Sequence, residues 1–240
     1  PALVAEELAW TAARFPGRVA AAFAPGYARS DFELLDADFD DRLERFVPAL
    51  GVLLGRLGDP DDGDPAVAAW ARRPGQILIA GNSRPGVRRA AAAGCGLLLP
   101  GGNARDRYRE LIGAYRDAGG PGPVVKIRQI WMGDPPPGAL EARDAVYRNA
   151  ATAQMRQARG FAEPFLHGSE EHILEALCRD AEEFGLDAMN IRFHLAGISH
   201  DQVLGQIARF GATVLPELRF PRPTPQATRE ALSAGEASQS

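Results

Sequence analysis

The sequence predicts an α/β protein built on a TIM-type (β/α)8 barrel. Its 240 residues approach the roughly 250 that such a barrel typically contains. Short apolar segments alternate with longer amphipathic ones, a pattern typical of a parallel sheet covered by helices. An open doubly wound sheet would show the same alternation, and a third observation, on residues 188–195, favours the barrel.

The segment 188–195 places apolar and polar side chains on opposite faces. Successive side chains of a strand point to opposite sides, which gives an apolar face (Met189, Ile191, Phe193, Leu195) and a polar face (Asn190, Arg192, His194). A strand covered by helices on both sides would be apolar on both faces. In a barrel, the inner face near the C-terminal end of a strand opens into the active site, where polar groups belong. An edge strand with one solvated face is the alternative.

Helices are predicted where apolar residues recur at helical spacing. The first covers residues 2–14, with Leu3, Val4, Leu8 and Trp10 facing the core, and the others cover 41–57, 87–93, 105–118, 139–159 and 170–184, with a closing helix after Ser199. Strands are predicted at Val19–Ala24, Ile77–Ala80, Gly96–Leu99, Val124–Met132 and Ala188–Leu195. The right-handed crossover rule makes these strands parallel neighbours in one curved sheet.

Proline, glycine and acidic residues mark the connections. Residues 31–41 should form a loop or short helix, and 58–65 a solvated linker whose aspartates are surface groups rather than a catalytic cluster. Beyond Arg219 the chain becomes rich in proline and then in Ser, Ala, Gly and Gln. We therefore expect one domain over residues 1–220 and a disordered tail over 221–240.

Charge and cysteine content exclude several classes of protein. The 27 basic and 31 acidic residues give a net charge of −4, so no electrostatic attraction to nucleic acid or an anionic membrane is expected. The longest apolar runs, such as 94–100, are too short to cross a bilayer. Cys95 and Cys178 lack metal-ligand spacing, so we expect no metal site and a reducing, cytoplasmic location. The chain begins at Pro1 without a signal segment, which predicts a processed product or a piece of a longer protein.

Six short motifs occur in an order that points to one family. They are Pro1–Trp10 with Gly17-Arg18, Ala24–Tyr27 with Asp31-Phe32, Gly81–Ser83, Gly94–Gly96, Gly168–Glu171 and Asn190–His194. Together they resemble the luciferase-like flavin monooxygenases, a superfamily of (β/α)8 barrels related to bacterial luciferase. The resemblance covers the C-terminal two-thirds of the family's barrel. It implies that three N-terminal strands, on the order of ninety residues, are absent, which would leave sheet edges exposed.

The loop Gly81–Gly86 is the first candidate cofactor contact. Small residues there allow backbone N–H groups to point at an anion, and the following helix N-terminus adds partial positive charge. The resemblance implies that the loop holds a flavin phosphate through the backbone of Asn82, the side chain of Ser83 and Gly86. The same sequence also suits a purely structural turn.

The loop Ala24–Tyr27 is the second candidate contact. Bacterial luciferase's catalytic subunit has a reactive cysteine and a phosphate-binding arginine where this chain has Ala24 and Pro25, which supply neither thiol nor charge. Arg29 would either replace that charge or be a solvated loop residue. Gly26 and Tyr27 remain as candidates, and Tyr27 would either lie beside the flavin ring or pack at the barrel rim.

The candidate catalytic residues are His194 and Arg192, which would bind substrate or position the oxygen that the flavin activates. A structural histidine on a strand is the alternative for His194. Lys126 and Arg128 share one face of their strand and should form a charged filling in the lower part of the barrel.

These features predict a flavin-dependent monooxygenase that uses reduced FMN and dioxygen on a small organic substrate. A separate flavin reductase would supply the reduced FMN, and we expect a homodimer or heterodimer. Two alternatives remain open: a deazaflavin-dependent oxidoreductase on the same scaffold, and a non-catalytic flavin-binding or partner subunit.

Overall fold

The computed structural model describes residues 1–72, 75–150 and 163–221. Its elements in chain order are α1 (Ala2–Arg14), β1 (Ala20–Phe23), α2 (Arg29–Leu34), α3 (Arg42–Leu57), α4 (Pro65–Arg72), β2 (Gln76–Ala80), α5 (Arg84–Ala92), β3 (Gly96–Leu99), α6 (Arg105–Asp117), β4 (Val124–Met132), α7 (Ala139–Ala150), β5 (Leu166–Gly168), α9 (Glu170–Phe184), β6 (Ala188–Arg192) and α10 (His200–Thr213). The predicted tail beyond Pro221 and the end of the helix predicted over 139–159 lie outside the described residues.

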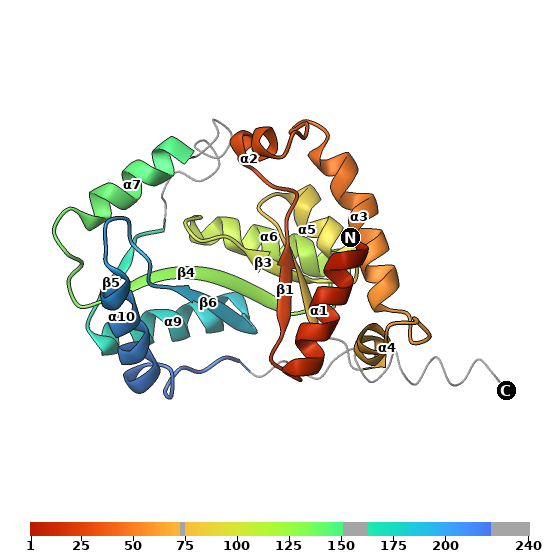
Figure 1. Cartoon of the computed structure of the whole chain (residues 1–240). Helices are drawn as coiled ribbons and strands as arrows, with labels where there is room; N and C mark the ends of the chain where they lie inside the picture. The colour runs from red at the N-terminus through yellow and green to blue at the C-terminus, as the bar shows by residue number, and fades with distance from the viewer. Residues whose placement is uncertain (73–74, 151–162, 222–240) are drawn as a thin grey trace.

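The described strands form one parallel sheet that curves into a half-barrel (Figure 1). β1, β2, β3 and β4 lie side by side in this order, and both β5 and β6 pair with β4. β6 pairs with Val125–Gln129 and β5 with Ile130–Met132. The five predicted strands are confirmed as parallel neighbours. The sequence does not reveal β5, because its 3 residues are too few to show an alternation.

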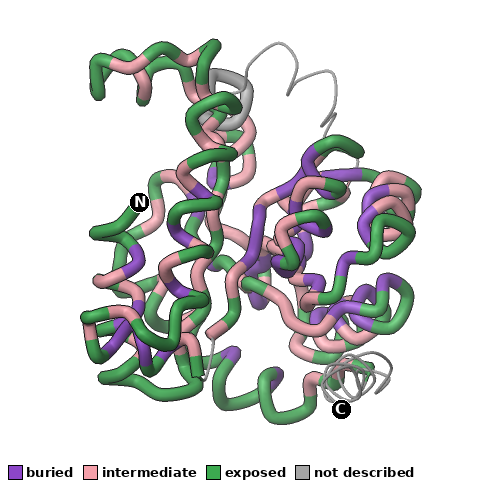
Figure 2. Tube along the Cα trace, turned by 90° about the vertical axis from the view of Figure 1, so that its right-hand side faces the viewer, coloured by how far each residue is buried: buried purple, intermediate pink, exposed green. Residues whose placement is uncertain are grey.

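Helices α5, α6 and α9 cover the convex face of the sheet, and the main core lies between these two layers (Figure 1). Alternate strand positions point into it and meet the apolar faces of the helices; the buried set includes Ile79, Leu97, Leu99, Val124, Val87, Ala90, Tyr108, Leu111 and Phe184. Buried positions gather where helices meet strands, whereas the outer turns of the helices are exposed (Figure 2). The hydrophobic effect therefore fixes the direction in which each strand's side chains point.

Helix α1 faces the core differently from the prediction. Its buried residues are Ala5 and Ala9, whereas Leu3 and Trp10 are 65% and 56% exposed. Small side chains let α1 approach α3 and α4 closely, and the three helices share a core around Val67. Trp10 instead donates its indole N–H to Asp64 Oδ2 at 3.0 Å.

Strand β6 ends at Arg192, three residues before its predicted end at Leu195. Its ladder with β4 finishes at the Gln129–Arg192 pair. The side-chain amide of Gln129 then donates to the carbonyl of His194, so a side chain takes over from the backbone ladder. The predicted alternation nevertheless continues, because Phe193 is buried against Phe210 of α10 and His194 is exposed.

Lys126 and Arg128 do not fill the inside of the barrel as predicted. They point to the convex side, where Lys126 lies between Asp180 of α9 and Glu163 and where Arg128 pairs with Glu163. Asp180 of α9 and Glu163, which precedes β5, provide the carboxylates on that side, and a buried ammonium group requires such partners.

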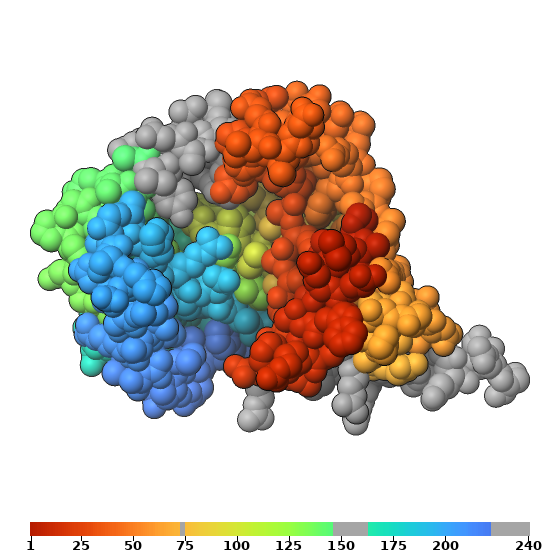
Figure 3. All heavy atoms as spheres, viewed as in Figure 1, coloured from red at the N-terminus to blue at the C-terminus, as the bar shows by residue number. Residues whose placement is uncertain are grey.

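The concave face of the sheet is open to solvent at both ends. Ala20 and Ala22 of β1 are exposed, as are Asn190 and Arg192 of β6. A hollow lies between the N-terminal segment (red) and the segment 188–213 (blue) in the space-filling view (Figure 3). The polar face of β6 therefore looks into the open side of the half-barrel.

Candidate functional site

The loops that follow the strands lie at one edge of the sheet, because all of its strands are parallel. We call this edge the rim; it comprises residues 24–28, 81–83, 100–104, 133–138 and 193–199. Every site residue predicted from the sequence lies on the rim, on β6 just below it, or in the first turn of α5. Parallel α/β sheets bind ligands at this edge.

The segment Gly81–Gly86, which we call the anion loop, joins β2 to α5. A Cβ on Gly81 would lie 2.9 Å from Val87 Cγ1 and 3.1 Å from Leu97 Cδ1, so the loop can approach the core only with glycine there. Ser83 caps α5, and its Oγ accepts a hydrogen bond from the N–H of Gly86 at 3.2 Å. These constraints fix the turn.

The anion loop presents unused hydrogen-bond donors. Within the described residues, the backbone N–H groups of Asn82, Ser83 and Arg84 have no acceptor, and Pro85 carries no N–H. Ser83 is exposed, and its hydroxyl accepts from Gly86 but still has a proton to donate. Gly86 is buried with its N–H already bonded, so it supports the cap rather than offering a donor. This donor set fits an anion such as a phosphate.

Two residues that the sequence did not identify hold the anion loop in place. Asn103 donates from Nδ2 to Asn82 Oδ1 at 2.8 Å, and Arg107 donates from Nη2 to the carbonyl of Asn82 at 2.9 Å. Hydrogen bonds from Arg107 and then Arg84 lower the pKa of Glu110, which keeps this charge cluster ionised. The one sequence signal for Asn103 and Arg107 is that they follow β3, the strand next to β2 in the sheet, so they come close to the anion loop after β2.

The loop after β1 places Gly26 and Tyr27 on the rim. Gly26 has a φ of +85°, and a Cβ there would lie 2.7 Å from the ring of Phe32, so this turn requires glycine. Tyr27 is 57% exposed. Arg29 forms an ion pair with Asp40 at 3.1 Å and lies over the ring of Phe39. Its guanidinium therefore has partners at the surface and does not replace the missing phosphate-binding charge.

The polar face of β6 forms an exposed row beneath the rim. Arg192 donates from Nε to Asn190 Oδ1 at 3.3 Å, and His194 follows at the strand end. β3 and β4 lie between β6 and β2 in the sheet, so His194 and Ser83 stand on opposite arms of the half-barrel. Ser83 and His194 are both exposed and both follow the C-terminal ends of strands, so they lie at the same edge of the sheet without contacting each other.

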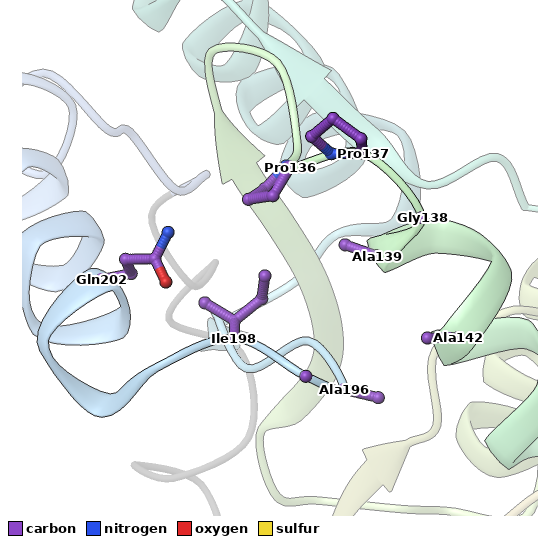
Figure 4. Close-up of a pocket in the computed structure, with 9 residues that line it drawn as sticks. Pro136, Pro137, Gly138, Ala139, Ala142, Ala196, Ile198 and Gln202 are labelled. Atoms are coloured by element: carbon purple, nitrogen blue, oxygen red, sulfur yellow. The ribbon is translucent and has the colours of Figure 1, made fainter.

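A pocket of about 290 Å³ opens beside the end of β6 (Figure 4). One wall is the turn into α7, and the other is the segment between β6 and α10; its lining is Pro136, Pro137, Gly138, Ala139, Ala142, Ala196, Gly197, Ile198 and Gln202. Gln202 belongs to the capping box of α10 with Ser199. The other lining residues have apolar side chains or none, and the backbone adds polar surface between them, so the pocket suits an uncharged part of a small molecule.

Buried charges behind the sheet are structural. Although burial raises the pKa of Asp180, the charge and hydrogen bond of Lys126 outweigh it, so the carboxyl stays ionised and its pKa is lowered. Burial, reinforced by Glu163, raises the pKa of Tyr108 and keeps the phenol neutral. These groups lie on the convex side with the helices, away from the concave face.

The sequence profile of the luciferase-like monooxygenase family matches residues 1–215. No curated protein sequence matches the chain. Among the described residues, no helix has the length and apolar character needed to cross a membrane.

Several solved structures share the fold. The monooxygenase RslO1 from Streptomyces bottropensis has a TM-score of 0.68 at 17% identity, over 90% of this chain and 74% of that one. An F420-dependent secondary alcohol dehydrogenase in complex with an F420-acetone adduct has a TM-score of 0.65 at 16% identity, over 91% and 75%. The oxygenating constituent of 3,6-diketocamphane monooxygenase from Pseudomonas putida, in complex with FMN, has a TM-score of 0.63 at 12% identity, over 93% and 77%. These chains therefore extend beyond the part that this protein matches.

Proposed function

The chain belongs to the luciferase-like monooxygenase family, and we propose that it is a flavin-dependent monooxygenase that uses reduced FMN and dioxygen on a small organic substrate. The observation that carries this proposal is the anion loop, whose free N–H groups and Ser83 hydroxyl meet at the N-terminus of α5. Such an arrangement suits the phosphate of FMN. A structural neighbour in complex with FMN adds support.

The residues of this chain would bind the cofactor, orient the substrate and shield both from water. The N–H groups of Asn82, Ser83 and Arg84 and the hydroxyl of Ser83 would hold the phosphate, with Gly26 and Tyr27 on the neighbouring rim loop toward the rest of the cofactor. When bound, reduced FMN supplies the electrons and the chemistry that activates dioxygen. Arg192 and His194, on the opposite arm, would position the substrate, and the adjacent apolar pocket would take its uncharged part.

A deazaflavin-dependent oxidoreductase is the second candidate, because a neighbour with the same fold holds an F420 adduct. Both cofactors carry a phosphate, so the anion loop suits either. A non-catalytic flavin-binding or partner subunit is the third, because Ala24 and Pro25 supply neither thiol nor charge. The anion loop with Ser83 suits cofactor binding in all three candidates.

The open half-barrel suggests a larger assembly. The exposed concave face and the outer edges of β1 and β6, which pair with no further strand among the described residues, would be covered if further strands completed a (β/α)8 barrel. We also propose a homodimer or heterodimer, a separate flavin reductase as the source of reduced FMN, and a cytoplasmic location.

The decisive experiment titrates the protein with FMN, riboflavin and a deazaflavin and follows flavin fluorescence and absorbance. A monooxygenase should bind FMN more tightly than riboflavin, and it should change the rate at which reduced FMN consumes oxygen relative to free reduced FMN, which oxygen oxidises without any protein. Preferential deazaflavin binding with no change in that rate would support the second candidate. FMN binding with no change in that rate would support the third, and no binding of any of these ligands would refute the proposal.

A further inference from the structure

We infer that Asn103 is a positioning residue that orients Asn82 in the anion loop toward a bound phosphate. This inference rests on the proposed flavin-binding function. Asn103 follows β3, is 1% exposed, and is 21 residues from Asn82 in the sequence. Its side chain touches no surface that a ligand could reach, so any effect on binding must pass through another residue.

The position of Asn103 is fixed from behind. Its backbone N–H donates to the hydroxyl of Tyr108 at 3.2 Å, and that hydroxyl also lies 3.0 Å from the carbonyl of Pro100. Tyr108 is completely buried in the main core. A rigid core residue therefore anchors the loop after β3.

The side chain of Asn103 makes a single hydrogen bond among the described residues. Nδ2 donates to Asn82 Oδ1 at 2.8 Å, whereas Oδ1 of Asn103 has no partner. The hydrogen bond to Asn82 is thus the one polar contact of the Asn103 side chain among the described residues, and it orients the amide of Asn82.

This contact decides which atoms of Asn82 remain available. An amide that accepts through Oδ1 keeps its NH2 group as the end open to a ligand, and Nδ2 of Asn82 has no acceptor among the described residues. The reverse orientation would turn oxygen lone pairs toward an anion. Arg107 fixes the carbonyl of Asn82, and because a peptide group is planar, this also sets the direction of the Ser83 N–H.

The test compares the affinities of FMN and riboflavin for the unaltered protein, Asn103→Ala, Asn82→Ala and the double variant. We expect Asn103→Ala to weaken FMN binding by about 3- to 10-fold, the range of one hydrogen bond, with riboflavin affinity unchanged because riboflavin lacks the phosphate. The double variant should bind FMN no more weakly than Asn82→Ala, since Asn103 acts through Asn82.

A control is Tyr115→Phe, which removes two hydrogen bonds away from the anion loop: the tyrosine hydroxyl donates to the carbonyl of Cys95 at 2.8 Å and accepts from the N–H of Gly122 at 2.9 Å. It should leave FMN affinity unchanged. An equal loss of FMN and riboflavin affinity in Asn103→Ala, no loss, or additive losses in the double variant would overturn the inference. If the unaltered protein binds FMN no better than riboflavin, the proposed phosphate site itself fails, and the inference with it.

Discussion

The Nζ atom of Lys126, the single lysine of the chain, lies 2.5 Å from Oδ2 of Asp180 in a completely buried position on the convex side of the sheet. Its other ionic partner is Glu163, and the rings of Tyr108 and Phe184 lie 4.5 and 5.3 Å away. This cluster joins β4 to α6 and α9. It therefore links the inner layer of the half-barrel to the helices that support the rim.

Replacing Lys126 by methionine should destabilise the fold by about 3–5 kcal/mol, because two buried carboxylates each lose one cationic partner and keep only Arg105 or Arg128. Denaturant unfolding followed by circular dichroism measures this change. The control is Arg179→Met, which breaks an exposed pair with Glu175 and should cost less than about 1 kcal/mol. Equal effects of the two substitutions would show that the buried cluster adds no stability.

Stability should fall in acid through Asp180. Burial raises the pKa of this carboxyl, but Lys126 and Arg105 lower it by more than burial raises it. The pKa of Asp180 in the folded protein therefore lies below its pKa in the unfolded chain. The ionised carboxyl stabilises the fold fully when the pH is above the pKa of the unfolded chain, about 3.9. This stabilisation is lost as the pH falls through the lower pKa of the folded protein. Unfolding free energies between about pH 6 and pH 2 should decline less steeply for Asp180→Asn than for the unaltered protein. Parallel curves would contradict the assignment.

Ser83→Ala should weaken FMN binding by about 10- to 100-fold, equivalent to about 1.5–3 kcal/mol, if its hydroxyl donates to the phosphate. It should also cost about 1 kcal/mol of stability, because Ser83 caps α5. Ser169 caps α9 in the same way, so Ser169→Ala should cost similar stability without changing FMN affinity. An unchanged affinity in Ser83→Ala would remove Ser83 from the site.

Phe193→Ala should destabilise the protein by about 3–5 kcal/mol through the cavity that it leaves. Phe193 is 7% exposed, and its ring centroid lies 5.4 Å from that of Phe210. Thermal and denaturant unfolding measure the loss. Ile207→Ala on α10 is the control, because Ile207 is 48% exposed and its truncation should cost little.

His194→Ala should leave both the fold and the flavin affinity intact, because the side chain is exposed on the concave side. It should lower turnover by about 100-fold if His194 positions substrate or transfers a proton. The rate of oxygen consumption relative to that of free reduced FMN measures turnover, and flavin titration measures affinity. His200→Ala, at the start of α10, is the control, and equal turnover in both variants would exclude a catalytic role for His194.

Local patterns in the sequence determined five of the six described strands and the face of β6. Alternation from Met189 to Leu195 assigns Phe193 to the core and His194 to the open side. Consecutive side chains of an extended segment point to opposite faces, so the direction of one fixes the direction of the other. The start of α5 was predicted at residue 87, whereas the helix begins at Arg84 because the Ser83 hydroxyl caps it by accepting from the N–H of Gly86. Family membership followed from motif order along the chain.

Only the tertiary structure decided which distant groups meet. The Asn82–Asn103 contact, the convex direction of Lys126 and the use of alanines in α1 each depend on which element packs opposite. Hydrogen bonds and ion pairs of this kind are set by the position and burial of a partner far away in the sequence, and no local periodicity encodes that position. The sequence alone therefore located the anion loop, whereas the packing of α6 against α5 placed Arg107 and the loop after β3 placed Asn103, the residues that hold it.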